Sequence, residues 1–500
     1  MKMIYNVKDK PKFGQLIVFA FQQLLAIMAA TIAVPMIVGN GMSTSAALFG
    51  AGIGTLVYVL FTKAKSPVFL GSSFAFLGAM FAAFGGAATA ALGYVGLIVG
   101  AVLAGLVYVV IALIVKFAGV KWINKIMPAV VIGPIVAIIG LSLAGNAIGD
   151  LTKVNYTEPV DMAQVQIVEV NTVNDDGTIA ESVVAVNDDG TVNPAITVTQ
   201  DESGSVSGTT QPGSPYVAII CGLVTLAVVM LCSVYGKKMA RLIPFIIGIL
   251  AGYLVATIFY FIGKATGNAA LMVIDYSALI NNFKAVSFSS FIALPDFSFL
   301  KAFGAFGELN GAYIGTIAAA YVPVAFVVFA EHIADHKNLS SIIEHDLLED
   351  PGLSRTLLGD GIGSMAGAFF GGCPNTTYGE SIGCVAITKN ASVSTIIVTA
   401  CEAIIISFIA PFVAFLSTIP SCVMGGVCIA LYGFIAVSGL KMLQKVDLDD
   451  NRNLFTASVI LITGVGGFIL TFGTITVTTV ACALILGILT NVILSKKKSK

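Results

Sequence analysis

Long apolar runs, separated by short polar breaks, dominate this sequence of 500 residues. A helix needs roughly 20 apolar residues to cross the hydrocarbon core of a bilayer, and most of the runs approach or exceed that length. We therefore predict an all-α polytopic membrane protein with fourteen membrane segments. They are expected near residues 14–38, 44–63, 68–86, 89–115, 126–147, 216–235, 240–263, 311–333, 355–371, 374–388, 391–416, 420–440, 453–472 and 474–495.

The composition supports this prediction and excludes other classes. Only 11% of the residues are charged and 57% are hydrophobic, whereas soluble domains carry about 25% charged residues. A net charge of −1 with no basic stripe argues against a nucleic-acid partner. The eight cysteines fall in or beside apolar segments without paired CxxC spacing, so we expect packing residues and no metal site. The first run is too long for the ~7–15-residue apolar core of a signal peptide.

The basic residues predict an orientation. Lys and Arg concentrate on the cytoplasmic side of membrane proteins, and an even number of segments places both termini on one side. With both termini inside, only Lys153, Lys264, Lys284 and Lys301 of 26 basic residues fall outside. We therefore expect a multi-pass cell-membrane protein with cytoplasmic termini.

Residues 148–214 differ from the rest because they are polar and rich in Thr, Val, Asn and Asp. The string "VNDDGT" occurs twice, at Val173–Thr178 and Val186–Thr191. Asp-Gly between β-forming residues is a hairpin signal, and the ligand spacing of a calcium loop is missing. This extracellular loop is predicted to form a small β cap.

Two of the fourteen segments are poor continuous helices. The third begins "SPVFLGSSFAF" (Ser66–Phe76) and the tenth begins "CPNTTYGESIG" (Cys373–Gly383). Each combines proline, β-forming residues and glycine before an apolar run, which indicates a short extended piece followed by a half-length helix. Such backbone is tolerated at membrane depth only inside the protein or along a cavity. A matching pair, third in each half of seven, points to a transporter site built from inverted repeats.

The starts of these half-helices offer free N–H groups and a positive dipole end. Phe74 and Gly379 lie near the two starts, so their backbone amides are candidate donors to substrate carbonyl oxygens.

Acidic residues lie close to the same elements. The eighth segment ends "FAEHIADHKN", which places Glu331 and Asp335 on one helix face, and His332 and His336 on another. Glu380 opens the tenth-segment half-helix. Ionisable groups in spans usually mark a pathway, a site or a proton relay.

Some of these groups have a plainer interpretation. Asp335 and the two histidines could instead form a solvated helix end at the cytoplasmic water line. Asp360 and Glu402 are further candidates for which helix packing or an interfacial role is an equal alternative.

Two motif matches are better explained as coincidence. "GDGIGSMAG" (Gly359–Gly367) resembles a dinucleotide fingerprint but lacks a βαβ unit, so its small residues are predicted to allow close helix packing. "GESIG" (Gly379–Gly383), with Ser381 at its centre, fits a hydrolase pattern without the soluble sheet that this pattern needs. No phosphate-binding loop is present, and we expect neither an enzyme nor an ATP-driven pump.

Two carboxylates and two backbone N–H groups between opposed half-helices suit a small planar ligand with alternating N–H and C=O groups. Uracil and xanthine have that alternation, and Phe74 and Tyr378 could form the walls of the site. A carboxylate in a low-dielectric pocket takes up a proton more readily than in water. This property offers a route to proton coupling without any cofactor.

At these residues the sequence resembles the nucleobase–ascorbate transporter family, most strongly its branch of bacterial uracil permeases. The strings "GSSFAF", "AEHI", "DLLEDPGLSRTLLGDG" and "PNTTYGE.IG..AIT" carry the resemblance, which covers nearly the whole chain outside 148–214. It implies fourteen segments in a 7+7 inverted repeat, paired antiparallel strands in segments three and ten, and a homodimer. The implied domains are a core domain (1–119 and 311–418), a gate domain (120–264 and 419–500) and an extracellular connection (265–310).

The resemblance also implies roles for individual residues. Glu331 and Glu380 clamp the substrate, Phe74, Gly379, Tyr378 and Ser73 complete its site, and Glu331, Asp335 and His332 handle the proton. Two positions depart from the family pattern: Asp335 replaces a usual histidine, and Ser381 replaces a usual asparagine.

We therefore expect a proton-coupled uracil importer. The alternatives are a xanthine or uric acid symporter of the same family and an uncoupled nucleobase facilitator.

Overall fold

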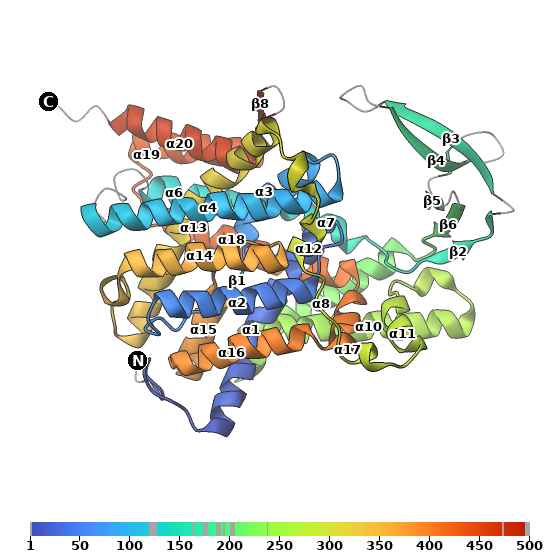
Figure 1. The fold of residues 1–500 in the computed structure, drawn as a ribbon, viewed down its shortest axis with the longest axis horizontal. Helices are drawn as coiled ribbons and strands as arrows, with labels where there is room; N and C mark the ends of the chain where they lie inside the picture. The colour runs from blue at the N-terminus through green and yellow to red at the C-terminus, as the bar shows by residue number, and fades with distance from the viewer. Residues whose placement is uncertain are drawn as a thin grey trace.

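Long apolar helices lie side by side and make up most of the chain (Figure 1). The computed structural model describes residues 3–119, 128–162, 165–173, 179–186, 192–193, 196–200, 206–237, 239–472 and 475–495. Within these ranges, eight helical stretches have the length and apolar composition to cross a membrane. They are α1 (Phe13–Val38), α2 (Thr44–Phe61), α4 (Ala90–Ala118), α6 (Ala129–Ser142) with α7 (Ala144–Leu151), α8 (Pro215–Tyr235), α10 (Pro244–Thr266), α13 (Gly311–Ile343) and α18 (Ser421–Leu443).

Further helices, most of them shorter, occupy the remaining predicted segments and the connections between them. They are α3 (Leu77–Gly85), α9 (Met239–Leu242), α11 (Ser277–Lys284), α12 (Ser298–Ala302), α14 (Leu353–Gly371), α15 (Gly379–Thr388), α16 (Val393–Ser407), α17 (Ala410–Ser417), α19 (Asn451–Val465) and α20 (Thr479–Ser495). The expected run 453–472 is not one helix, because α19 ends before Gly466 and Gly467, and Gly467 has a φ of +68°. The hairpin strands β8 (Leu470–Phe472) and β9 (Ile475–Val477) follow it.

The two interrupted segments meet at their extended pieces, as predicted. Strand β1 (Leu70–Ser72) pairs antiparallel with β7 (Asn375–Thr377), in a register that places Gly71 opposite Thr376. A 3₁₀ turn at Phe74–Phe76 and then α3 follow β1, while α15 follows β7. Each strand therefore leads directly into a short helix.

Neighbouring groups satisfy the backbone of these strands within the apolar interior. The Leu70 amide donates to the Thr55 hydroxyl of α2 at 2.9 Å, and the Ser73 amide donates to the Pro374 carbonyl at 2.9 Å. Unsatisfied backbone groups cost several kcal/mol in a bilayer. These hydrogen bonds explain how extended backbone can exist at this depth.

Glycines bring α2 and α14 into close contact around the strand pair. A methyl group built on Gly363 would lie 2.7 Å from the Gly54 carbonyl oxygen, and one on Gly50 would overlap the Gly367 carbonyl. Asn375 donates from β7 to the Gly50 carbonyl at 3.1 Å. The prediction that the small residues of "GDGIGSMAG" serve helix packing is therefore confirmed.

The polar insert forms small sheets at the end of the helices opposite the N-terminus (Figure 1). Strands β3 (Gln166–Val173) and β4 (Ile179–Val186) form an antiparallel pair, and β2 (Glu158–Val160), β6 (Val206–Thr210) and β5 (Ile196–Gln200) form a second sheet. The hairpin strands expected around the first "VNDDGT" are confirmed. The turn residues 174–178 and the second copy at 187–191 lie outside the described residues.

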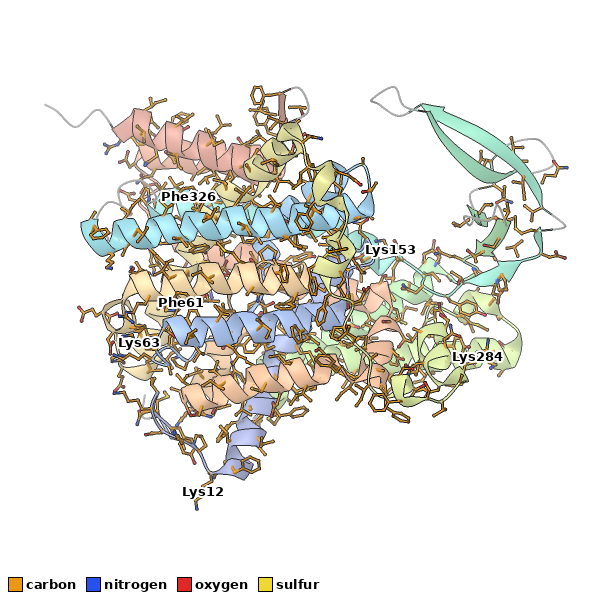
Figure 2. The ribbon with its side chains drawn as sticks, viewed as in Figure 1. Lys12, Phe61, Lys63, Lys153, Lys284 and Phe326 are labelled. Atoms are coloured by element: carbon orange, nitrogen blue, oxygen red, sulfur yellow. The ribbon has the colours of Figure 1, made fainter. Side chains whose placement is uncertain are left out.

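Basic residues divide between the two ends of the helices. In Figure 2, Lys63 lies at the end from which the N-terminal segment starts, whereas Lys153 and Lys284 lie at the end that carries the insert. Lys63, which is predicted inside, thus lies at the opposite end from Lys153 and Lys284, which are predicted outside.

We predict that Gly363→Ala lowers the unfolding free energy by about 1–3 kcal/mol, the usual cost of overpacking, because its methyl group meets the rigid backbone of α2. Thermal unfolding of the detergent-solubilised protein measures the effect. Gly433→Ala in α18 is the control, since a methyl group there meets nothing within 4 Å. Equal stability of the two variants would show that the α2–α14 contact is not tight.

Candidate functional site

A cavity of about 430 Å³ lies where the two short helices begin. Its volume is in the range of small-molecule sites, about 300–1,000 Å³. The cavity is lined by the residues after β1, by β7, and by residues of α1, α6, α9, α10, α13, α15 and α18. Seven predicted site residues line it: Ser73, Phe74, Glu331, Asp335, Tyr378, Gly379 and Glu380.

The helix starts point hydrogen-bond donors at this cavity. Gly379 is the first residue of α15 and Phe74 the first of its 3₁₀ turn, so their N–H groups have no acceptor within the helix. A methyl group on Gly379 would meet nothing within 4 Å, so its backbone is open to the cavity. Among the described residues, the buried hydroxyls of Ser73 and Thr376 also lack a hydrogen-bond partner. Both residues line the cavity, and their unpaired hydroxyl groups are buried beneath its surface.

Three carboxylates face the same space. Glu331 and Asp335 are one turn apart on α13, and Glu380 lies in the first turn of α15. The Thr377 hydroxyl of β7 donates to Asp335 at 2.7 Å, which fixes that carboxylate beside the strand pair. In the part of the chain that the structure describes, no ion pair joins any of the three to a basic side chain. Glu331 and Glu380 can therefore accept N–H groups from a ligand without first breaking an ion pair.

Tyr378 forms a fixed wall of the cavity. Its hydroxyl donates to the Ser72 carbonyl at 2.7 Å, and its ring lies so close to Gly71 that any side chain there would overlap it. Phe74 meets the Tyr432 ring of α18 edge to face, with centroids 6.0 Å apart. Tyr378 is thus held by the β1 strand, and Phe74 is in contact with α18.

His332 lies outside the cavity. Its Nδ1 is 2.6 Å from Asp360 Oδ2, its Nε2 is 3.0 Å from the Thr356 hydroxyl, and its ring stacks on His336 at 4.0 Å. His336 Nε2 in turn lies 2.6 Å from the Tyr58 hydroxyl. Both histidines are fully buried, so a solvated helix end is the wrong interpretation for them. Asp360 belongs to this buried network, and Glu402 lies on α16 away from the cavity.

The structure identifies a supporting contact that the sequence analysis missed. Ser381 Oγ accepts hydrogen bonds from Gln23 of α1 at 2.5 Å and from the Phe69 amide at 3.1 Å. Ser381 follows Glu380, so these bonds hold the start of α15 against α1 and the chain before β1. The sequence offered two separate signals, the departure at Ser381 and the polar pair "QQ" within the first apolar run, but nothing in it connected them.

We predict that Ser381→Ala lowers the unfolding free energy by about 1–3 kcal/mol. The change leaves the Phe69 N–H without an acceptor and leaves the Gln23 amide only its 3.3 Å bond to the Ser381 carbonyl. Thermal unfolding in detergent measures the loss. The matched control is Ser407→Ala, because the hydroxyl of this buried serine only donates to the Ile404 carbonyl of its own helix. If both variants unfold at the same temperature, Ser381 does not hold α15 in place.

Comparison with known proteins supports an assignment to a family. The model of the permease family matches residues 14–173 and 201–473. The uracil permease of Bacillus caldolyticus is 36% identical over 99% of this chain and 95% of its own length. The uracil permease of Bacillus subtilis is 36% identical over 100% of this chain and 97% of its own length. The uracil permease of Escherichia coli K12 is 32% identical over 97% of this chain and 92% of its own length.

Solved structures show the same fold at low identity. The transmembrane domain of the cyanobacterial bicarbonate transporter BicA superposes with a TM-score of 0.58 at 13% identity, covering 97% of this chain and 99% of that domain. SLC26A9 superposes with a TM-score of 0.58 at 12% identity, covering 97% of this chain and 66% of its own. The chain therefore has a mostly helical, multi-pass transporter fold.

Proposed function

We propose that the chain, which belongs to the permease family, imports uracil across the cell membrane in symport with protons. The observation that carries this proposal is the position of Glu331 and Glu380 in one cavity with the N–H groups of Phe74 and Gly379. The names of the full-length relatives support uracil as the substrate.

The binding mode follows from the chemistry of the cavity. Uracil presents ring N–H groups beside carbonyl oxygens, so its N–H groups donate to Glu331 and Glu380. Its carbonyl oxygens accept from the amides at the two helix starts, where the helix dipole also favours negative charge. Tyr378 and Phe74 enclose the ring, and Ser73 offers a further polar contact.

Proton coupling uses the acids that face the cavity. A proton on Glu331 or Asp335 removes a charge from the site, and its release restores the charge. With a neutral substrate each proton carries one charge, worth about 2.3 kcal/mol per 100 mV of membrane potential. Asp335 takes the position of the usual family histidine, and Thr377 stabilises its carboxylate. His332 supports this region through Asp360 and does not contact the ligand.

We further propose the organisation that this cycle requires. Fourteen segments form two inverted repeats of seven, with a core domain that carries the strand pair and a gate domain across the cavity. The β1–β7 pairing supports this arrangement, because the two strands come from the third segment of each repeat. The chain works as a homodimer with both termini in the cytoplasm.

Glu331→Gln and Glu380→Gln are expected to lower uracil affinity about tenfold to a hundredfold, because hydrogen bonds to a charged group contribute about 1.5–3 kcal/mol. The measurement is uptake of labelled uracil into proteoliposomes, with and without an inward proton gradient, in competition with xanthine. The wild type should show gradient-stimulated uptake that xanthine does not reduce.

Glu402→Gln is the matched control, because it removes an acid of a membrane helix outside the cavity. Competition by xanthine without uracil accumulation would contradict the substrate. Uptake that ignores the gradient would contradict proton coupling and leave a facilitator.

A further inference from the structure

The charges that line the cavity are separated between two sets of elements. The three carboxylates, Glu331, Asp335 and Glu380, come from α13 and α15. Arg241 comes from α9, the short helix between α8 and α10, and is the only basic side chain among the described residues that line the cavity. The acids and Arg241 therefore lie in the core and gate domains, respectively, as proposed above.

The packing of α9 holds Arg241 beside the helix that carries Glu380. The neighbouring residue Leu242 is buried in an apolar cluster with Ala26 of α1 and Cys384 of α15. Cys384 is four residues after Glu380, so both lie on the same face of α15. Arg241 therefore comes from a helix that packs against the helix of Glu380, and both residues line the same cavity.

Arg241 is exposed in this structure and makes no ion pair with a carboxylate within the described residues. Glu331, Asp335 and Glu380 also have no basic partner among the described residues. A single charged side chain at the centre of a bilayer costs about 2.5–3.5 kcal/mol on insertion scales. A carrier that changes conformation with empty, ionised acids must offset this cost, whereas a loaded carrier offsets it with bound uracil and protons.

We propose that Arg241 is the counter-charge for the empty carrier. When the cavity contains no substrate and the gate moves against the core, the Arg241 guanidinium pairs with Glu380 and lowers the cost of the return step. With uracil bound, a ring N–H of the ligand donates to Glu380, and Arg241 remains unpaired. This inference rests on the proposed function, and it assigns to Arg241 a role in turnover rather than in substrate binding.

The proposal separates two transport modes. Net uptake requires the empty carrier to return, but exchange of internal for external uracil does not. Arg241→Gln is therefore expected to slow gradient-driven net uptake about tenfold, because the Glu380 carboxylate of the empty carrier then has no counter-charge during the return step. Uracil–uracil exchange should stay within about twofold of the wild type, and Arg241→Lys, which keeps the charge, should restore net uptake.

The experiment measures both modes in proteoliposomes that contain the full chain. Lys237→Gln is the control, because it removes an exposed basic residue of the same connection that does not line the cavity. Arg241→Met must likewise slow net uptake and leave exchange unchanged. This second variant keeps the test valid if Arg241→Gln does not fold. Equal loss of net uptake and exchange, or no loss of either, overturns the role of Arg241. Absence of uracil transport by the wild type in both modes instead overturns the proposed function.

Discussion

The pairing of β1 with β7 is the interaction on which the rest of the molecule depends. Two extended pieces inside an apolar interior must satisfy their backbone groups without water. They do so with each other and with nearby groups such as Thr55 and Pro374. Because both helices start where the strands end, the pairing also brings two sets of unpaired N–H groups to one cavity.

Close helix packing makes room for this pair. Gly50 and Gly54 of α2 lie against Gly363 and Gly367 of α14, and Asn375 of β7 reaches the α2 backbone between them. Side chains at these positions would push the helices apart and leave the strands without neighbours. The glycines in these two segments thus support the substrate site indirectly, through the distance between α2 and α14.

The polar groups of the interior fall into two sets with different surroundings. Glu331, Asp335 and Glu380 face the cavity, whereas His332 lies one residue away from Glu331 and is enclosed by Asp360, Thr356 and His336. Adjacent residues on a helix point in different directions, so one stretch of α13 supplies both a face that lines the cavity and a buried polar network. Opposite the acids, α9 contributes a positive charge from a separate element.

The sequence by itself determined the membrane class, the positions of the long helices and the pair of interrupted segments, because apolar length and proline–glycine breaks are local properties. It also predicted seven of the residues that line the cavity, since acids and half-helix starts are rare in apolar segments. Contacts between distant segments required the tertiary structure. Gln23 and Ser381 are 358 positions apart, and only folding shows that they meet. The separation of His332 from the cavity and the entry of Arg241 into it also depend on how the helices pack, because packing decides which face of each helix meets the cavity.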